Sequence, residues 1–98
     1  MNIEKGEDMN MDNMMFRALL KNSGTNYYFL CGGTITEIQN YLHEQDTERA
    51  DNIETTKFCA SIAGNILGCL LANKPMPEGP WCEKYSNGLT IMIARSNT

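Results

Sequence analysis

The sequence predicts an α+β fold: a two-layer sandwich in which two helices pack on one antiparallel sheet of about four strands, in the order β-β-α-α-β-β. Two observations lead to this class. Near both ends of the chain, apolar residues occur in short strand-like segments separated by turn signals, whereas residues 34–73 repeat them at helical spacing. A chain of 98 residues also has room for only one core. We therefore expect a single α+β domain over residues 14–98, preceded by an acidic, flexible N-terminal arm over residues 1–13.

The first two strands are expected to form a hairpin over Met14–Cys31. Within residues 14–21 the side chains alternate, with one face made of Met14, Phe16, Ala18 and Leu20 and the other of Met15, Arg17, Leu19 and Lys21. Residues 22–25 (NSGT) supply turn chemistry, and the aromatic segment 26–31 (NYYFLC) is typical of a strand.

Two helices should follow. Gly32 and Gly33 end the second strand, and Thr34 with Glu37 three residues later predicts a capping box. An apolar stripe then predicts a helix to about Glu44, its members being Ile35, Ile38, Tyr41 and Leu42. A second helix is predicted to begin near Thr47 or Asp51 and to run to about Asn73, because the segment from Ile53 onward is apolar on most sides.

Small residues recur every four positions along the second helix, namely Ala60, Gly64, Gly68 and Ala72. An interior glycine costs a helix about 1 kcal/mol relative to alanine. A close approach of another element should offset that cost. The approaching element is either the chain's own sheet or first helix, or the same helix of a second copy in a homodimer.

The chain should close with a second hairpin. Prolines 75, 77 and 80 stop the helix, and two strands over Trp81–Tyr85 and Leu89–Arg95 are joined through Ser86-Asn87-Gly88, a strong hairpin signal. The expected core consists of Phe16, Phe29, Ile38, Leu42, Phe58, Ile62, Ile66, Leu70, Ile91 and Ile93.

Charge and hydropathy narrow the functional classes. Twelve Asp and Glu against eight Lys and Arg give a net charge of −4, which argues against direct binding of nucleic acid. Gly, Asn and Ser interrupt the longest apolar stretch, so no membrane association is expected. The polar start of the chain does not have the pattern of a signal peptide, and we expect a cytoplasmic protein.

Four cysteines are present, and none forms a CxxC pair. Free thiols in a reducing compartment are the main expectation for Cys31, Cys59, Cys69 and Cys82. A disulfide between Cys31 and Cys82 on neighbouring strands is the alternative. With His43 as the single histidine, neither a metal site nor a cofactor is expected.

An acidic cluster provides the main functional hypothesis. Only Arg49 opposes five carboxylates within residues 44–54, namely Glu44, Asp46, Glu48, Asp51 and Glu54. Such a surface favours a partner protein with a basic surface. The chain is therefore expected to be a small non-enzymatic protein that inhibits or adapts its partner. In size and charge it resembles phage or mobile-element proteins that occlude basic surfaces of host defence or nucleic-acid machinery, which is an analogy and not a motif match.

Two alternatives concern the end of the second strand. Gly32, Gly33 and Thr34 precede a helix N-terminus, where backbone N–H groups can bind a nucleotide or another anion, with Tyr27 or Tyr28 stacking on a base. No Walker lysine and no GxGxxG motif accompany them. Alternatively, Cys31 beside that N-terminus could act as the nucleophile of a cysteine-dependent enzyme or enzyme subunit.

Overall fold

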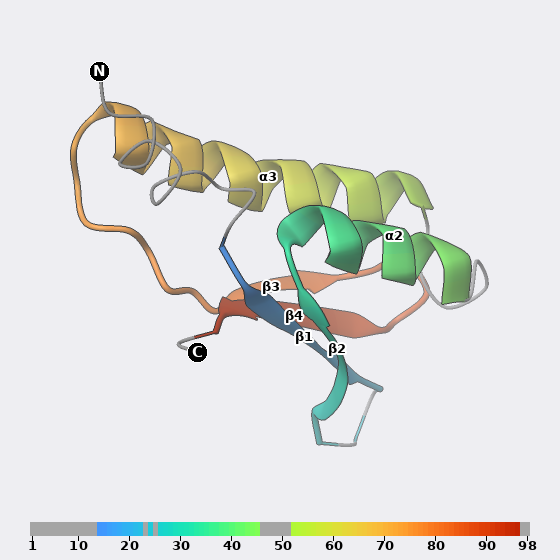
Figure 1. Ribbon diagram of the computed structural model, residues 1–98. Coiled ribbons are helices and arrows are strands. Elements are labelled where there is room, and N and C mark those ends of the chain that lie inside the picture. Colours follow the sequence, from blue (N-terminus) through green and yellow to red (C-terminus); the bar gives the residue numbers. More distant parts are fainter. Residues whose placement is uncertain (1–13, 23, 25, 46–51, 97–98) are drawn as a thin grey trace.

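Six elements follow one another in the predicted order in the computed structural model, which describes residues 14–22, 24, 26–45 and 52–96 (Figure 1). They are β1 (Phe16–Lys21), β2 (Tyr28–Gly33), α2 (Ile35–Gln45), α3 (Asn52–Leu71), β3 (Trp81–Lys84) and β4 (Thr90–Arg95). The expected N-terminal arm lies outside the described residues.

The four strands form one antiparallel sheet in the order β2-β1-β4-β3. The central pair, β1 and β4, comes from the two halves of the chain, and Ala18 lies opposite Ile93. Figure 1 shows α2 and α3 on the same side of this sheet, and residues 72–80 return from the far end of α3 to the sheet. The predicted α+β two-layer architecture is confirmed.

The alternation predicted for β1 gives the sheet two different faces. On the inner face, which the helices cover, Phe16, Ala18 and Leu20 are at most 2% exposed. Ile91 and Ile93 of β4 continue this inner face opposite them. Arg17 and Leu19 point to the other side, which we call the outer face.

Local signals account for the helix bounds. In the predicted capping box, the backbone N–H of Thr34 donates to Glu37 Oε1 at 2.9 Å and that of Glu37 donates to Thr34 Oγ1 at 3.1 Å. α3 ends where Asn73 adopts a positive φ of 57°, two residues before Pro75. One side of α3 is buried, consisting of Thr55, Phe58, Cys59, Ile62 and Ile66.

Eight of the ten expected core residues are buried. The prediction that Phe29 belongs to the core is wrong, because its side chain is 62% exposed. A register irregularity between Ala18 and Leu19 places Cys31 opposite Ala18 but Phe29 opposite Leu19. One extra residue in β2 reverses the face of every residue before it, so Phe29 points to the outer face. Leu70 is only partly buried, at the margin of the core.

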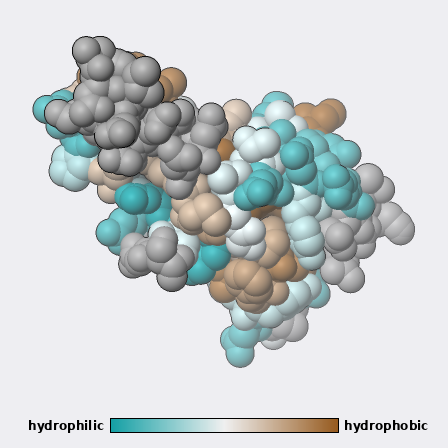
Figure 2. All heavy atoms as spheres, in the orientation of Figure 1, coloured by the Kyte–Doolittle hydropathy of each residue, from teal (hydrophilic) through white to brown (hydrophobic). Residues whose placement is uncertain are grey.

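The two edges of the sheet differ. β3 has only four residues, two of them charged (Glu83 and Lys84), and Pro80 directly precedes it. Short length, charge and proline are the features that protect an edge from further pairing. β2 has six residues without charge or proline, and only the irregularity near Leu30 interrupts it. Figure 2 shows hydrophobic residues gathered over this strand.

Candidate functional site

The structure describes two members of the acidic cluster. Glu44 is exposed near the end of α2, and Glu54 is half-buried in the first turn of α3. Asp46, Glu48 and Asp51 lie outside the described residues. The imidazole Nε2 of His43 and Thr56 Oγ1 are 3.3 Å apart, so the end of α2 lies beside the start of α3. The described part of the cluster therefore lies where the two helices meet.

Glu54 has a structural role that its place in the cluster did not predict. Its Oε1 accepts a hydrogen bond from the backbone N–H of Ser86, and its Oε2 accepts one from the Ser86 hydroxyl, both at 2.9 Å. The carboxylate thus ties the start of α3 to the turn between β3 and β4. Beside it, Thr55 and Tyr85 form a buried hydroxyl pair.

The expected anion site at the start of α2 is filled by the chain itself. Glu37 Oε1 already accepts the Thr34 N–H that an anion would use. Gly33 has a φ of 149°, and a Cβ at this position would come within 2.6 Å of the same carboxylate oxygen. A bound anion would have to displace a negatively charged side chain from the helix N-terminus.

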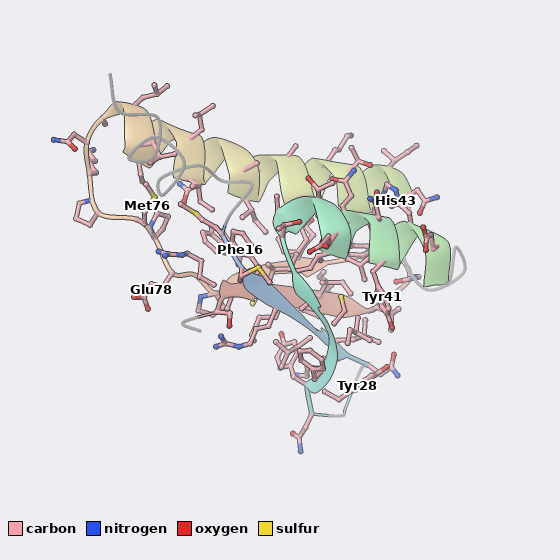
Figure 3. All side chains as sticks on the ribbon, in the orientation of Figure 1. Phe16, Tyr28, Tyr41, His43, Met76 and Glu78 are labelled. Atoms are coloured by element: carbon pink, nitrogen blue, oxygen red, sulfur yellow. The ribbon has the colours of Figure 1, made fainter. Side chains whose placement is uncertain are left out.

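Tyr27 and Tyr28 lie away from that N-terminus. Tyr28 is at the opposite end of β2, about 17 Å from Gly33 at the rise of a strand, and Tyr27 precedes it. Figure 3 shows Tyr28 at the lower end of β2, whereas α2 begins at the upper end. The Nζ of Lys21 lies 5.5 Å from the centroid of the Tyr27 ring. The structure therefore does not bring the residues of the ligand hypothesis together.

The cysteine positions bear on two earlier alternatives. All four thiols are free. The Cys31–Cys82 disulfide is wrong, because β2 and β3 are the opposite edges of the sheet. Burial raises the pKa of Cys31. An activated nucleophile needs the opposite shift.

The small residues of α3 do not pack inside the molecule. Ala60, Gly64 and Gly68 of α3 are exposed, as is Ala72 directly after it, and a Cβ on either glycine would meet nothing within 4 Å. The expected close packing against the chain's own sheet or first helix is therefore wrong. Large apolar side chains share this side of α3, with exposed fractions of 67% for Ile53, 48% for Leu67 and 80% for Leu71. We call this surface the solvent face of α3, made of Ile53, Ala60, Gly64, Leu67, Gly68 and Leu71.

The outer face of the sheet is a second open surface, which was not predicted from the sequence. Its apolar members include Leu19 and Met92, which lie directly opposite each other on β1 and β4. Their alternation with core residues was visible in the sequence. Which strands become neighbours was not, because strand order follows from contacts far apart along the chain.

Other kinds of site find little support in the described ranges. No three His, Cys, Asp or Glu side chains come together there as metal ligands. Neither helix is both long and apolar enough to cross a membrane. Comparisons of the chain with models of protein families, with curated proteins and with solved structures give no match.

Proposed function

We propose that the chain is a non-enzymatic protein-binding module whose partner docks on the solvent face of α3. One observation carries this proposal. Residues 58–71 contain no charged side chain, although α3 buries only one of its sides. Exposed Lys57 stands beside Ile53 on this side, and from Ala60 to Leu71 the face carries no charge. An exposed apolar surface on a protein in water is typical of a protein-interaction site.

The face has the dimensions of a helix-binding surface. Ile53 and Leu71 stand at its two ends, about 27 Å apart at the rise of an α-helix. Between them, Gly64 and Gly68 leave the helix backbone accessible to a neighbouring element. Since interaxial distance depends on side-chain size, glycines permit the short end of the usual 8–10 Å range. We propose that an apolar helix or groove wall of the partner lies along this line, with the large side chains as anchors.

The negative charge of the two helices favours a partner with basic residues beside its apolar surface. Residues 35–71 carry six carboxylates and only two Lys or Arg side chains. Glu44 is exposed where the start of the α3 face meets the end of α2. A partner with basic residues next to its apolar surface would be steered toward this end. Occlusion of such a basic surface would inhibit or adapt the partner without any chemistry.

Site-specific photo-crosslinking tests the docking face. A photoreactive phenylalanine replaces Leu71, and in a matched control it replaces Asn65, which is exposed on α3 but does not belong to the face. We expect one discrete cross-linked protein from position 71 and none from position 65. The purified partner should then bind L67S/L71S at least about tenfold more weakly than wild type, with unchanged circular dichroism.

Equal cross-linking from both positions, or equal affinity of L67S/L71S, would overturn the proposal. A cross-link between two copies of the chain would identify the face as a homodimer interface and replace the separate partner.

A further inference from the structure

The outer face of the sheet has an apolar centre that runs across the strands. Phe29 of β2 lies opposite Leu19 of β1, and Leu19 lies opposite Met92 of β4. Met92 in turn faces Cys82 on the edge strand β3. At the usual strand spacing this row is about 14 Å long. Neither of the two described helices covers it, since α2 and α3 both lie on the inner side (Figure 1).

Cations stand on both sides of this apolar row. One row further along, Lys21 and Lys84 flank Thr90, which pairs with both of them. On the other side, Arg17 lies opposite Ala94. Each flanking position is two residues, or about 7 Å, from the apolar row. Every charged residue that the described strands place on this face is therefore positive, in a chain whose net charge is −4.

The two lysines also line a hollow of about 300 Å³ at one end of the face. Asn22 and Thr90 add polar groups to it, and Gly24 and Gly88 leave room at its rim. The hollow is open to water, so carboxylates could reach the lysines without a large desolvation cost.

From this pattern we infer that the outer face is a docking surface for an acidic amphipathic helix of another protein. The apolar stripe of that helix packs on Leu19, Phe29 and Met92. Its flanking carboxylates reach Lys21 and Lys84 on one side and Arg17 on the other. A helix about 10 Å wide fits between cations placed about 7 Å to each side. Docking would give the sheet a second helical layer, the arrangement in which both faces of a sheet are covered.

Nucleic acid fits this face less well, although it is also an anion. Stacking of bases needs exposed aromatic rings, and the ring of Tyr27 already lies beneath the ammonium group of Lys21. Among the described residues, Phe29 is the one strongly exposed aromatic side chain of the face. A phosphate backbone would also be repelled over its length by a net charge of −4, whereas a short carboxylate-bearing helix meets the local cations alone.

The inference can be tested with synthetic probes, independently of any partner of α3. The main probe is a fluorescein-labelled helical peptide with a leucine stripe flanked by glutamates. Two control peptides carry glutamine or lysine in place of glutamate, and a third control is labelled oligo-dT. Fluorescence anisotropy at low and physiological salt should show binding of the glutamate peptide only. K21E/K84E should weaken it at least about tenfold. The matched control is K57E, which reverses a charge on α3 in the opposite layer. It should leave the affinity for the glutamate peptide unchanged.

Backbone amide shifts on addition of the glutamate peptide should concentrate at Leu19 and Met92 and leave Gly64 unmoved. The inference is overturned if the glutamine or lysine peptide binds as well, if K57E weakens binding as much as K21E/K84E, or if no peptide binds at low salt. Tighter binding of oligo-dT through the same lysines would assign the face to nucleic acid instead. Loss of partner binding in L67S/L71S with peptide binding intact would show that the two surfaces act separately.

Discussion

The hydroxyl oxygens of Thr55 and Tyr85 lie 2.9 Å apart in the interior, and the two residues are 0% and 2% exposed. Each hydroxyl provides the other with a hydrogen-bond partner that water does not supply there. Because Thr55 is in α3 and Tyr85 directly follows β3, this bond joins the helical layer to the sheet. Glu54, one position before Thr55, and Ser86, one position after Tyr85, repeat the connection at the surface.

Removal of one hydroxyl should therefore be costly. We expect Tyr85→Phe to lower the free energy of unfolding by about 1–3 kcal/mol, since it leaves the buried Thr55 hydroxyl without this partner. Thr55→Val should cost a similar amount. The double variant should cost less than the sum, because neither hydroxyl is then left unsatisfied. Urea denaturation of the four proteins measures the coupling, and strict additivity would contradict it.

Alkaline pH should destabilise the fold through the same region. Burial raises the pKa of Cys59 from 9.0 to about 12, and burial, offset in part by the Thr55 hydrogen bond, raises that of Tyr85 from 10.0 to about 12. In the unfolded chain both groups lose their protons at lower pH than in the folded one. Their contribution to stability is therefore complete below pH 9 and is lost as the pH rises from about 9 to 12.

Urea denaturation between pH 7 and 11 measures this loss. Cys59→Ala should flatten the decline of the free energy of unfolding at alkaline pH, because this variant lacks the thiol whose pKa is raised. Cys82→Ala, at an exposed position, should leave the decline as it is. An unchanged slope in Cys59→Ala would show that the buried thiol does not cause the effect.

Two glycine-to-alanine changes should have opposite effects on stability. Gly64→Ala should raise the free energy of unfolding by about 0.5–1 kcal/mol, because the new methyl group meets nothing and alanine favours the helix. Gly33→Ala should lower it by about 1 kcal/mol or more, because the added Cβ strains the positive φ and collides with Glu37. Thermal unfolding compares them directly. A destabilised Gly64→Ala would mean that something already packs on that helix.

Reversal of the acidic cluster should affect association more than stability. The triple change of Glu44, Asp46 and Glu48 to lysine should slow association with a basic partner about tenfold or more and flatten its salt dependence. Each change alone should be nearly neutral, because exposed charge pairs contribute little. Surface plasmon resonance at several salt concentrations measures both quantities. A wild-type rate and salt slope in the triple variant would place the interface elsewhere.

Local signals in the sequence predicted the elements well. The capping box at Thr34 and the turn at Gly88, whose φ is 92°, depend on residues a few positions apart, so they could be identified without the structure. The face of Phe29 could not, because it follows from the irregularity of β2 against β1. The role of Glu54 depends on Ser86, 32 positions away.

The candidate surfaces, too, could be predicted from the sequence only in part. Small residues at Gly64 and Gly68 were evident, but only their surroundings show that they face water. The cationic side of the sheet combines residues from β1 and β3, which become close only when β4 lies between them. Strand order depends on long-range packing, and alternation within a single strand does not encode it.

The unequal edges of the sheet also limit how copies of this protein can assemble. A new strand can be added at β2, whereas charge, shortness and Pro80 close the edge at β3. A chain with one open edge can pair only with the same edge of a second chain, and such a pair has no open edge left for a third. Edge-to-edge pairing of this sheet would therefore end at two molecules and would not grow into a fibre.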